Sequence, residues 1–162
     1  VVFKPALDDR YALNEVVSHD KSRTKSVNIV SPSEIFAHID EHTDVVAIDE
    51  IQFLTEDVLE VVEFMVNHGI LVIVSGLDTD FRGEPFTFMP KLLAKAENVL
   101  KLSAVCVKCG APATKTQRIV DGKPAKYHDP IVLIGASESY EARCRSCHKV
   151  YYKPKLKLEL PW

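Results

Sequence analysis

The stretch Val45-Val46-Ala47-Ile48-Asp49-Glu50 decides the fold that we predict for this chain. A continuous apolar run without polar alternation is typical of a central strand in a parallel sheet, covered on both faces. Such sheets place ligands at the carboxyl ends of their strands, and Asp49 and Glu50 follow this strand directly. Two adjacent carboxylates beside a buried sheet need cations or hydrogen-bond donors. The alternative is an acidic surface turn after an ordinary core strand.

The segments after this strand predict an α/β fold. Thr55 can cap a helix whose apolar residues repeat at helical spacing and whose end is marked by Gly69. Residues 70–74 then read as a second, fully buried strand, so a right-handed βαβ crossover is the natural topology. Three further elements are predicted: a helix that begins at the capping sequence Ser31-Pro32-Ser33-Glu34, a short helix at about residues 89–97, and a strand over residues 98–105.

The composition is that of an ordinary globular protein. The chain has 162 residues, of which 46% are hydrophobic and 27% charged, enough for one compact domain or a domain plus a small module. A net charge of −3 without a basic block argues against a nucleic-acid surface. No apolar run approaches the length of a membrane span. Because Val1-Val2-Phe3 reads as the end of a strand without an initiator methionine, we expect the natural chain to begin upstream.

Two loops are expected at the same edge of the sheet as the acidic pair. In the first, Pro5 ends a strand, and Asp8, Asp9 and Arg10 follow. The planar fork of an arginine there could bind phosphate. From these residues alone, however, an ordinary surface Asp–Arg pair is the favoured interpretation.

The second loop follows the strand at 70–74 and adds aromatic side chains to the predicted crevice. Phe81 and Phe86 flank Arg82 in this part of the sequence. The alternative is that both phenylalanines only fill the core.

Two cysteine pairs predict a metal centre in the second half of the chain. Cys106 and Cys109 form one C-x₂-C knuckle, and Cys144 and Cys147 form another. Two such knuckles can bind one tetrahedral zinc ion, and four thiolates leave no open position for catalysis, so a structural ion is favoured. Two disulfides are the alternative, and His148 is a possible additional ligand.

Between the knuckles the chain is expected to form a loop tethered at both ends. Asp121-Gly122-Lys123 reads as a hairpin turn. The apolar residues 131–135 come next and lead to Tyr140. If a metal ion pins both knuckles, this segment is a lasso that could close over a ligand.

Taken in order, these segments resemble the type II thymidine kinases, the family that includes the human cytosolic enzyme. The similarity runs from Val1 to about Val150. The matching pieces are Lys4-Pro5 through Asp8-Asp9-Arg10-Tyr11, Asp49 to Phe53, Gly76-Leu77-Asp78, Phe81-Arg82-Gly83, Pro85-Phe86, Leu102 to Cys106 with Cys109, Ile134-Gly135-Ala136, Tyr140, and Cys144 to Cys147.

The resemblance implies a fold and a reaction. The fold would be a P-loop NTPase-like parallel sheet with helices over residues 1–102, a zinc-ribbon-like lobe with a substrate lasso over 103–150, and a tail over 151–162. The reaction would be Mg²⁺-assisted transfer of the γ-phosphoryl group of ATP to the 5′-hydroxyl of thymidine, a step of deoxynucleoside salvage for DNA synthesis. The family's glycine-rich phosphate loop is expected upstream of Val1.

The resemblance also implies roles for individual residues. Glu50 would be the general base, Asp49 would hold Mg²⁺, and Arg10 would steady the phosphates. The ATP and Mg²⁺ site would comprise Asp8, Asp9, Arg10, Asp49, Glu50, Ile51 and Gln52. The thymidine site would comprise the side chains of Phe53, Leu77, Phe81, Phe86 and Tyr140 and the main chain of Ile131, Val132, Leu133, Ile134 and Gly135. A structural zinc ion would be bound by Cys106, Cys109, Cys144 and Cys147.

The same resemblance implies a cytoplasmic homotetramer that is inhibited by thymidine triphosphate and binds neither nucleic acid nor membrane. Two other functions fit parts of the sequence. An ATPase of the recombinase or helicase kind would also end an apolar strand in Asp-Glu, but it needs a basic surface that the composition lacks. A non-catalytic zinc-ribbon interaction module would use the α/β part only as a scaffold.

Overall fold

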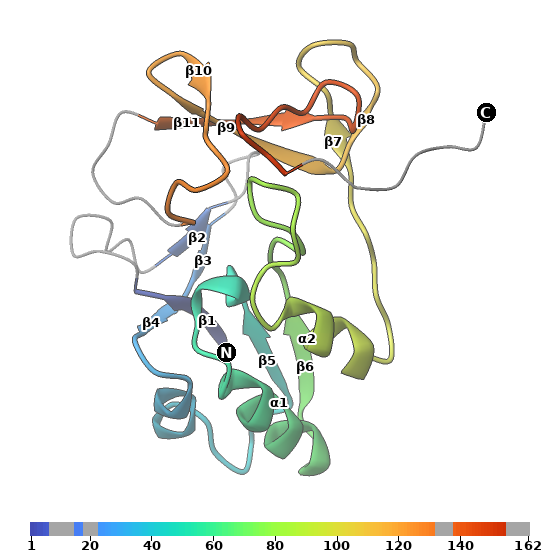
Figure 1. The fold of residues 1–162 in the computed structure, drawn as a ribbon. Helices are drawn as coiled ribbons and strands as arrows, with labels where there is room; N and C mark the ends of the chain where they lie inside the picture. Colours follow the sequence, from blue (N-terminus) through green and yellow to red (C-terminus); the bar gives the residue numbers. More distant parts are fainter. Residues whose placement is uncertain (7–14, 18–22, 132–137, 155–162) are drawn as a thin grey trace. The chain divides into compact units, whose positions relative to one another are not determined.

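The computed structural model describes residues 1–6, 15–17, 23–131 and 138–154, and the chain divides into two compact units. Unit 1 comprises Val1–Asp78 and Thr87–Lys95, and unit 2 comprises Thr79–Phe86 and Ala96–Trp162. Figure 1 shows a parallel sheet with helices in the first and antiparallel strands in the second. The predicted fold class, an α/β sheet with a four-cysteine lobe, is confirmed.

Unit 1 is built on a four-stranded sheet in the order β4-β1-β5-β6, with all neighbours parallel. The strands are β1 (Val2–Pro5), β4 (Val27–Ile29), β5 (Val45–Ile48) and β6 (Leu71–Val74). The apolar run at residues 45–48 is β5, and its register sets Ile48 between Phe3 and Val74. Its carboxyl end therefore delivers Asp49 and Glu50 to one edge of the sheet.

Burial of this sheet differs from the prediction in two places. In β5, Val46 and Ile48 are buried, but Val45 is 38% exposed, so the two faces are not equally covered. In β6, Leu71 and Ile73 are 58% and 54% exposed, and the prediction of a fully buried strand is wrong. The reason is position: among the described strands β6 pairs only with β5, so it forms an edge of this sheet.

The helices of unit 1 partly follow the predicted signals. Helix α1 (Val58–Asn67) connects β5 to β6 and buries Val58, Val61 and Met65. It ends before Gly69, whose φ of +84° suits a glycine. Helix α2 (Met89–Lys95) lies where a short helix was predicted.

Two local predictions in unit 1 need correction. Thr55 does not cap α1, because Asp57 occupies the N-cap position. The segment after Ser31 forms a short 3-10 helix, η2 (Pro32–Ala37), although the predicted capping contact is present and Glu34 Oε1 accepts from Ser31 N at 3.1 Å. Pro5 is the last residue of β1, opposite Ile29, so it ends the strand as predicted. A separate antiparallel pair, β2 (Glu15–Val17) and β3 (Arg23–Lys25), follows β1 along the chain.

Unit 2 contains a three-stranded antiparallel sheet and a two-stranded one. The first has the order β10-β9-β11, from β10 (Lys123–Pro124), β9 (Lys115–Val120) and β11 (Glu138–Arg143), and the second pairs β7 (Ala104–Val105) with β8 (Pro112–Ala113). The predicted turn joins β9 to β10, and Asp121 and Gly122 have φ of 49° and 74°, as a two-residue hairpin turn requires.

The strand predicted over 98–105 forms only at its end, as β7. Leu100 and Leu102, in the part that is not a strand, are 82% and 79% exposed. The apolar pattern predicted burial in a sheet, but no strand in the described part of the chain pairs with residues 98–103.

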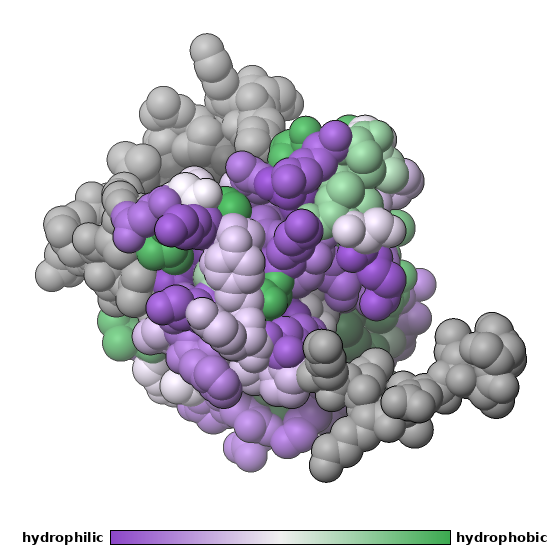
Figure 2. All heavy atoms as spheres, turned by 45° about the horizontal axis from the view of Figure 1, so that its top comes forward, coloured by the Kyte–Doolittle hydropathy of each residue, from purple (hydrophilic) through white to green (hydrophobic). Residues whose placement is uncertain are grey.

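The exposed surface is mixed in character. Figure 2 shows one face, on which hydrophilic residues predominate and hydrophobic ones are scattered among them. Within the described ranges, no helix is both long and apolar enough to cross a membrane.

Candidate active site and metal centre

Glu50 occupies the carboxyl end of β5 in an unusual backbone conformation. Its φ and ψ are 52° and 36°, the left-handed region, and its side chain is exposed. For a residue other than glycine this conformation costs roughly 1–2 kcal/mol. It allows the chain to turn sharply into the 3-10 helix η3 (Ile51–Phe53), where Phe53 N donates to Glu50 O at 3.1 Å. The turn presents the carboxylate to solvent directly after a buried strand.

A buried amide orients this carboxylate. Gln52 is 2% exposed, and its Nε2 donates to Glu50 Oε2 at 2.5 Å. Its Oε1 accepts from the backbone N of Leu77 at 3.1 Å. A single side chain therefore connects the residues that follow β5 to those that follow β6. Hydrogen bonds to a charged group are the stronger kind, which makes this an effective support for Glu50.

Asp49 faces a hydroxyl group from the neighbouring strand end. Ser75 Oγ donates to Asp49 Oδ1, while the backbone N of Ser75 donates to Ile48 O at 2.9 Å. The backbone N of Asp49 donates to Phe3 O at 2.9 Å, so both residues are fixed by the ends of the sheet. A carboxylate and a hydroxyl are hard oxygen donors, the kind of ligand that Mg²⁺ prefers. These residues fit an Mg²⁺ site.

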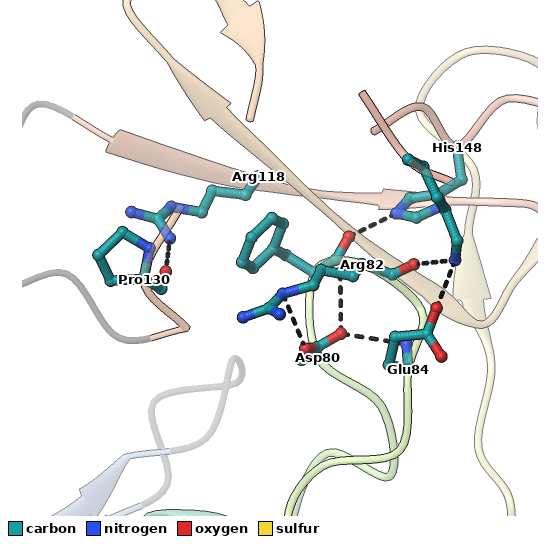
Figure 3. Close-up of polar contacts among 8 residues, drawn as sticks. Asp80, Arg82, Glu84, Arg118, Pro130 and His148 are labelled. Atoms are coloured by element: carbon teal, nitrogen blue, oxygen red, sulfur yellow. Dashed lines mark hydrogen bonds and ion pairs between the residues drawn. The ribbon is translucent and has the colours of Figure 1, made fainter. Parts of the chain in front are cut away.

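In unit 2, a tight loop holds Phe81 with its ring buried. Asp80 is 3% exposed, and its Oδ1 accepts from the backbone N of Arg82 at 2.9 Å and of Glu84 at 3.1 Å (Figure 3). The Arg82 Nε lies 3.4 Å from Asp80 Oδ2. The guanidinium carbons of Arg82 and Arg118 lie 5.4 Å and 5.2 Å from the centre of the Phe81 ring. Both distances fall within the range of cation–π attraction.

His148 connects the second cysteine knuckle to this loop. Its Nε2 lies 2.8 Å from the carbonyl oxygen of Phe81, so this nitrogen carries the proton and donates it (Figure 3). Burial lowers the pKa of His148, in keeping with a neutral ring. The metal-ligand cluster found among the described residues does not include it. Its role here is to hold a backbone group.

The four cysteines converge as predicted. The sulfur atoms of Cys106, Cys109, Cys144 and Cys147 all lie within 4.8 Å of one another, and all four thiols are free. Zinc–sulfur bonds of about 2.3 Å in a tetrahedron place sulfur atoms about 3.8 Å apart. The distance of 3.6 Å between the sulfur atoms of Cys109 and Cys144 agrees with this spacing. The set fits one zinc ion, and the disulfide alternative is not found.

The thiols also differ in acidity in the way that a shared cluster produces. A backbone hydrogen bond from Cys144 lowers the pKa of Cys106 to about 6. The side chain of Cys144, followed by that of Cys109, raises the pKa of Cys147 to about 12. Sulfur atoms this close compete for protons, and a divalent cation would take the place of those protons.

A family model described as thymidine kinase matches residues 1–148. The chain belongs to the thymidine kinase family. The match covers most of the 162 residues and includes both cysteine knuckles, the acidic pair and the Phe81 loop. Membership makes the protein a kinase, that is, a transferase that binds a nucleotide. It confirms the resemblance on which the predicted roles depend.

The remaining predicted site residues of this family member are distributed as follows. Ile51 is completely buried, Phe53 is half-buried, and Leu77 is 41% exposed. Phe81 and Phe86 are buried, Ile131 is half-buried, and Tyr140 is 50% exposed on β11. Asp8, Asp9 and Arg10, and the lasso residues Val132, Leu133, Ile134 and Gly135, lie outside the described residues.

Sequence reasoning missed two residues that contact the predicted site. Ser75 was not singled out, although a serine at the end of the strand next to Asp49 is the signal that could have found it. Arg118 was missed because a charged residue between Gln117 and Ile119 reads as one polar position of a surface strand. Nothing in the local pattern indicates that its side chain is completely buried.

Proposed function

We propose that the protein transfers the γ-phosphoryl group of ATP to the 5′-hydroxyl of thymidine, with Glu50 as the general base. The observation that carries this proposal is the Glu50 carboxylate itself, which is exposed, strained into a left-handed turn and oriented by the buried amide of Gln52. Strained residues are retained where the surrounding structure and the chemistry require them. A carboxylate so placed can accept the hydroxyl proton as the phosphoryl group is transferred.

Asp49 is proposed to hold Mg²⁺, and Arg10 to steady the phosphates. The oxygen donors of Asp49 and Ser75 support the first assignment. When bound, Mg²⁺ neutralises the charge that develops on the phosphates. The chain's own contribution is alignment, because phosphoryl transfer needs little covalent help from the protein.

Thymidine is proposed to bind through the side chains assigned by the resemblance and through the main chain of residues 131–135. Leu77 and Tyr140 support this assignment, since both have enough exposed surface to contact a ligand. Recognition by main-chain groups would explain why an apolar segment can read a polar base edge. From the same resemblance, we also propose that the protein is a homotetramer and that thymidine triphosphate inhibits it.

The substitution Glu50→Gln tests the proposed base. Glutamine keeps the shape of the side chain and can still accept the hydrogen bond from Gln52, but it cannot take a proton. We expect turnover to fall by about 10²–10⁴-fold, with thymidine binding by calorimetry unchanged. The assay measures the variant beside an active wild-type protein. Glu41→Gln, at a side chain 87% exposed, is the control.

Three outcomes would contradict the proposal. Near-normal turnover of Glu50→Gln would remove Glu50 from the role of base. ATP hydrolysis that is stimulated by nucleic acid and needs no nucleoside would favour the recombinase-like ATPase. Absence of thymidine binding by the wild type would favour the non-catalytic module.

The cysteine cluster is proposed to hold a structural zinc ion. Four thiolates leave no coordination position for substrate, which supports a structural rather than a catalytic ion. We expect elemental analysis to find about one zinc per chain, and Cys144→Ser to lower both zinc content and the stability of the protein, because binding free energy is folding free energy at such sites. A zinc-free wild type of unchanged stability would contradict this.

A further inference from the structure

Arg118 is a charged residue in a place where an apolar one would be expected. It lies in the middle of β9 and is completely buried. Burying a guanidinium group is costly, and apolar residues of similar volume often serve stability as well or better. What the arginine adds is a planar group with several donors and a face that can stack on an aromatic ring.

The contacts of Arg118 lead to three parts of the proposed thymidine site. Its guanidinium carbon lies 5.2 Å from the centre of the Phe81 ring. Its Nη1 donates to the carbonyl oxygen of Pro130 at 2.5 Å, directly before Ile131, where the proposed base-binding main chain begins (Figure 3). Its partner in the antiparallel register with β11 is Tyr140. Residues directly opposite each other in such a pair project from the same face of the sheet.

We propose that Arg118 is a positioning residue of the nucleoside site. Its guanidinium group lies over the Phe81 ring and donates to the Pro130 carbonyl oxygen, directly before Ile131. On β9 it lies opposite Tyr140 of β11. The inference rests on the proposed function, and it adds a residue that need not touch the nucleoside. Neither an ammonium group nor an apolar side chain can stack and donate in this way at once.

A second buried arginine in the same unit provides a matched control. Arg143 lies on β11 and is 7% exposed. It donates from Nε to Glu141 Oε2 at 2.9 Å and from Nη1 to the Cys147 carbonyl oxygen at 3.4 Å. These hydrogen-bond partners, Glu141 and Cys147, are not among the residues proposed to bind thymidine. A substitution there measures what the loss of a buried arginine does to the unit in general.

The experiment compares Arg118→Met, Arg118→Lys and Arg143→Met with the active wild-type protein. Zinc content and circular dichroism establish that each variant is folded. We expect both Arg118 variants to raise KM for thymidine by about 10-fold or more, equivalent to losing one good contact, with kcat and KM for ATP changed by less than about 3-fold. Arg143→Met is expected to lower the unfolding midpoint without raising KM for thymidine.

A double-mutant cycle adds a readout that general destabilisation would not produce. Phe81→Leu and Arg118→Met should be non-additive in KM for thymidine, because each removes the same stacked pair. If Arg118→Met fails to fold, the cycle is run with Arg118→Lys, which keeps the charge.

The possible outcomes distinguish failure of the positioning role from failure of the proposed function on which it rests. An active wild type whose Arg118 variants keep a normal KM for thymidine, or change it no more than Arg143→Met does, would overturn the positioning role alone. Additive effects in the cycle would do the same. A wild type that phosphorylates no nucleoside would overturn the proposed function, and the positioning role with it.

Discussion

The substitution Gln52→Leu tests whether one buried amide supports the acidic end of β5. The amide donates to the Glu50 carboxylate and accepts from the Leu77 N–H. A hydrogen bond to a charged group contributes about 1.5–3 kcal/mol and a neutral one about 0.5–1.5 kcal/mol. The better burial of a leucine offsets roughly 1 kcal/mol of that loss. We therefore expect the free energy of unfolding to fall by about 1–3 kcal/mol.

Chemical denaturation and thermal melting measure this change. For a chain of this length, about 1 kcal/mol corresponds to a shift of about 2–4 °C in the melting temperature. Glu41→Leu is the control, since its side chain is 87% exposed and surface substitutions usually change stability by less than about 0.5 kcal/mol. The reasoning is refuted if Gln52→Leu melts within error of this control.

A second variant tests the direction of the hydrogen bond. Gln52→Glu keeps the shape of the side chain, but it replaces the donating NH₂ group with an oxygen that faces the Glu50 carboxylate. We expect Gln52→Glu at neutral pH to be at least as unstable as Gln52→Leu, because like charges in contact repel. A Gln52→Glu protein as stable as the wild type would show that Nε2 does not face Glu50.

Two further predictions concern the packing around these sites. Gly76→Ala should lower the free energy of unfolding by about 1–3 kcal/mol, because the added methyl group would collide with Gln52 Oε1 and lie 3.2 Å from Ile51 Cγ2. Denaturant titration measures this change, and an unchanged midpoint would show that the Gln52 amide moves aside freely. Gln117→Leu should lower the free energy of unfolding by about 2–4 kcal/mol, because the Gln117 side chain donates to the Lys149 carbonyl oxygen and accepts from the Lys149 N–H, both at 2.8 Å. If the Lys149 N–H of the variant stays protected from hydrogen exchange, this reasoning is wrong.

The parts of the fold that the sequence predicted are those with a strong local cause. The run at 45–48 forms β5 because a continuous apolar run is typical of a strand within a parallel sheet. Asp121 and Gly122 formed the turn because both positions need a positive φ that few residues adopt easily. The cysteine knuckles converged because their spacing suits a tetrahedral ion. The strand and the turn each depend on a few neighbouring residues, and each knuckle on two cysteines three positions apart.

The parts that were not predicted depend on neighbours distant in sequence or on elements too short to show a pattern. Nothing within residues 70–74 indicates that β6 is an edge strand, paired only with β5 among the strands that the structure describes. The exposure of Leu71 and Ile73 follows from this edge position. The short strand β4 escaped notice because three residues, Val27–Ile29, are too few to show a period. The burial of Arg118 requires Phe81, 37 positions away, to lie over it.

The double attachment of Gln52 limits how this enzyme could be redesigned. Substituting Leu77 to admit a bulkier nucleoside at the proposed thymidine site would shift the same backbone N–H that anchors the amide bonded to Glu50. Under the proposed function, substrate range and catalytic rate are therefore coupled through Gln52, and a substitution that broadens the range is expected to lower the rate. Variants that broaden specificity should be sought at positions remote from Leu77, so that Gln52 continues to orient the Glu50 carboxylate.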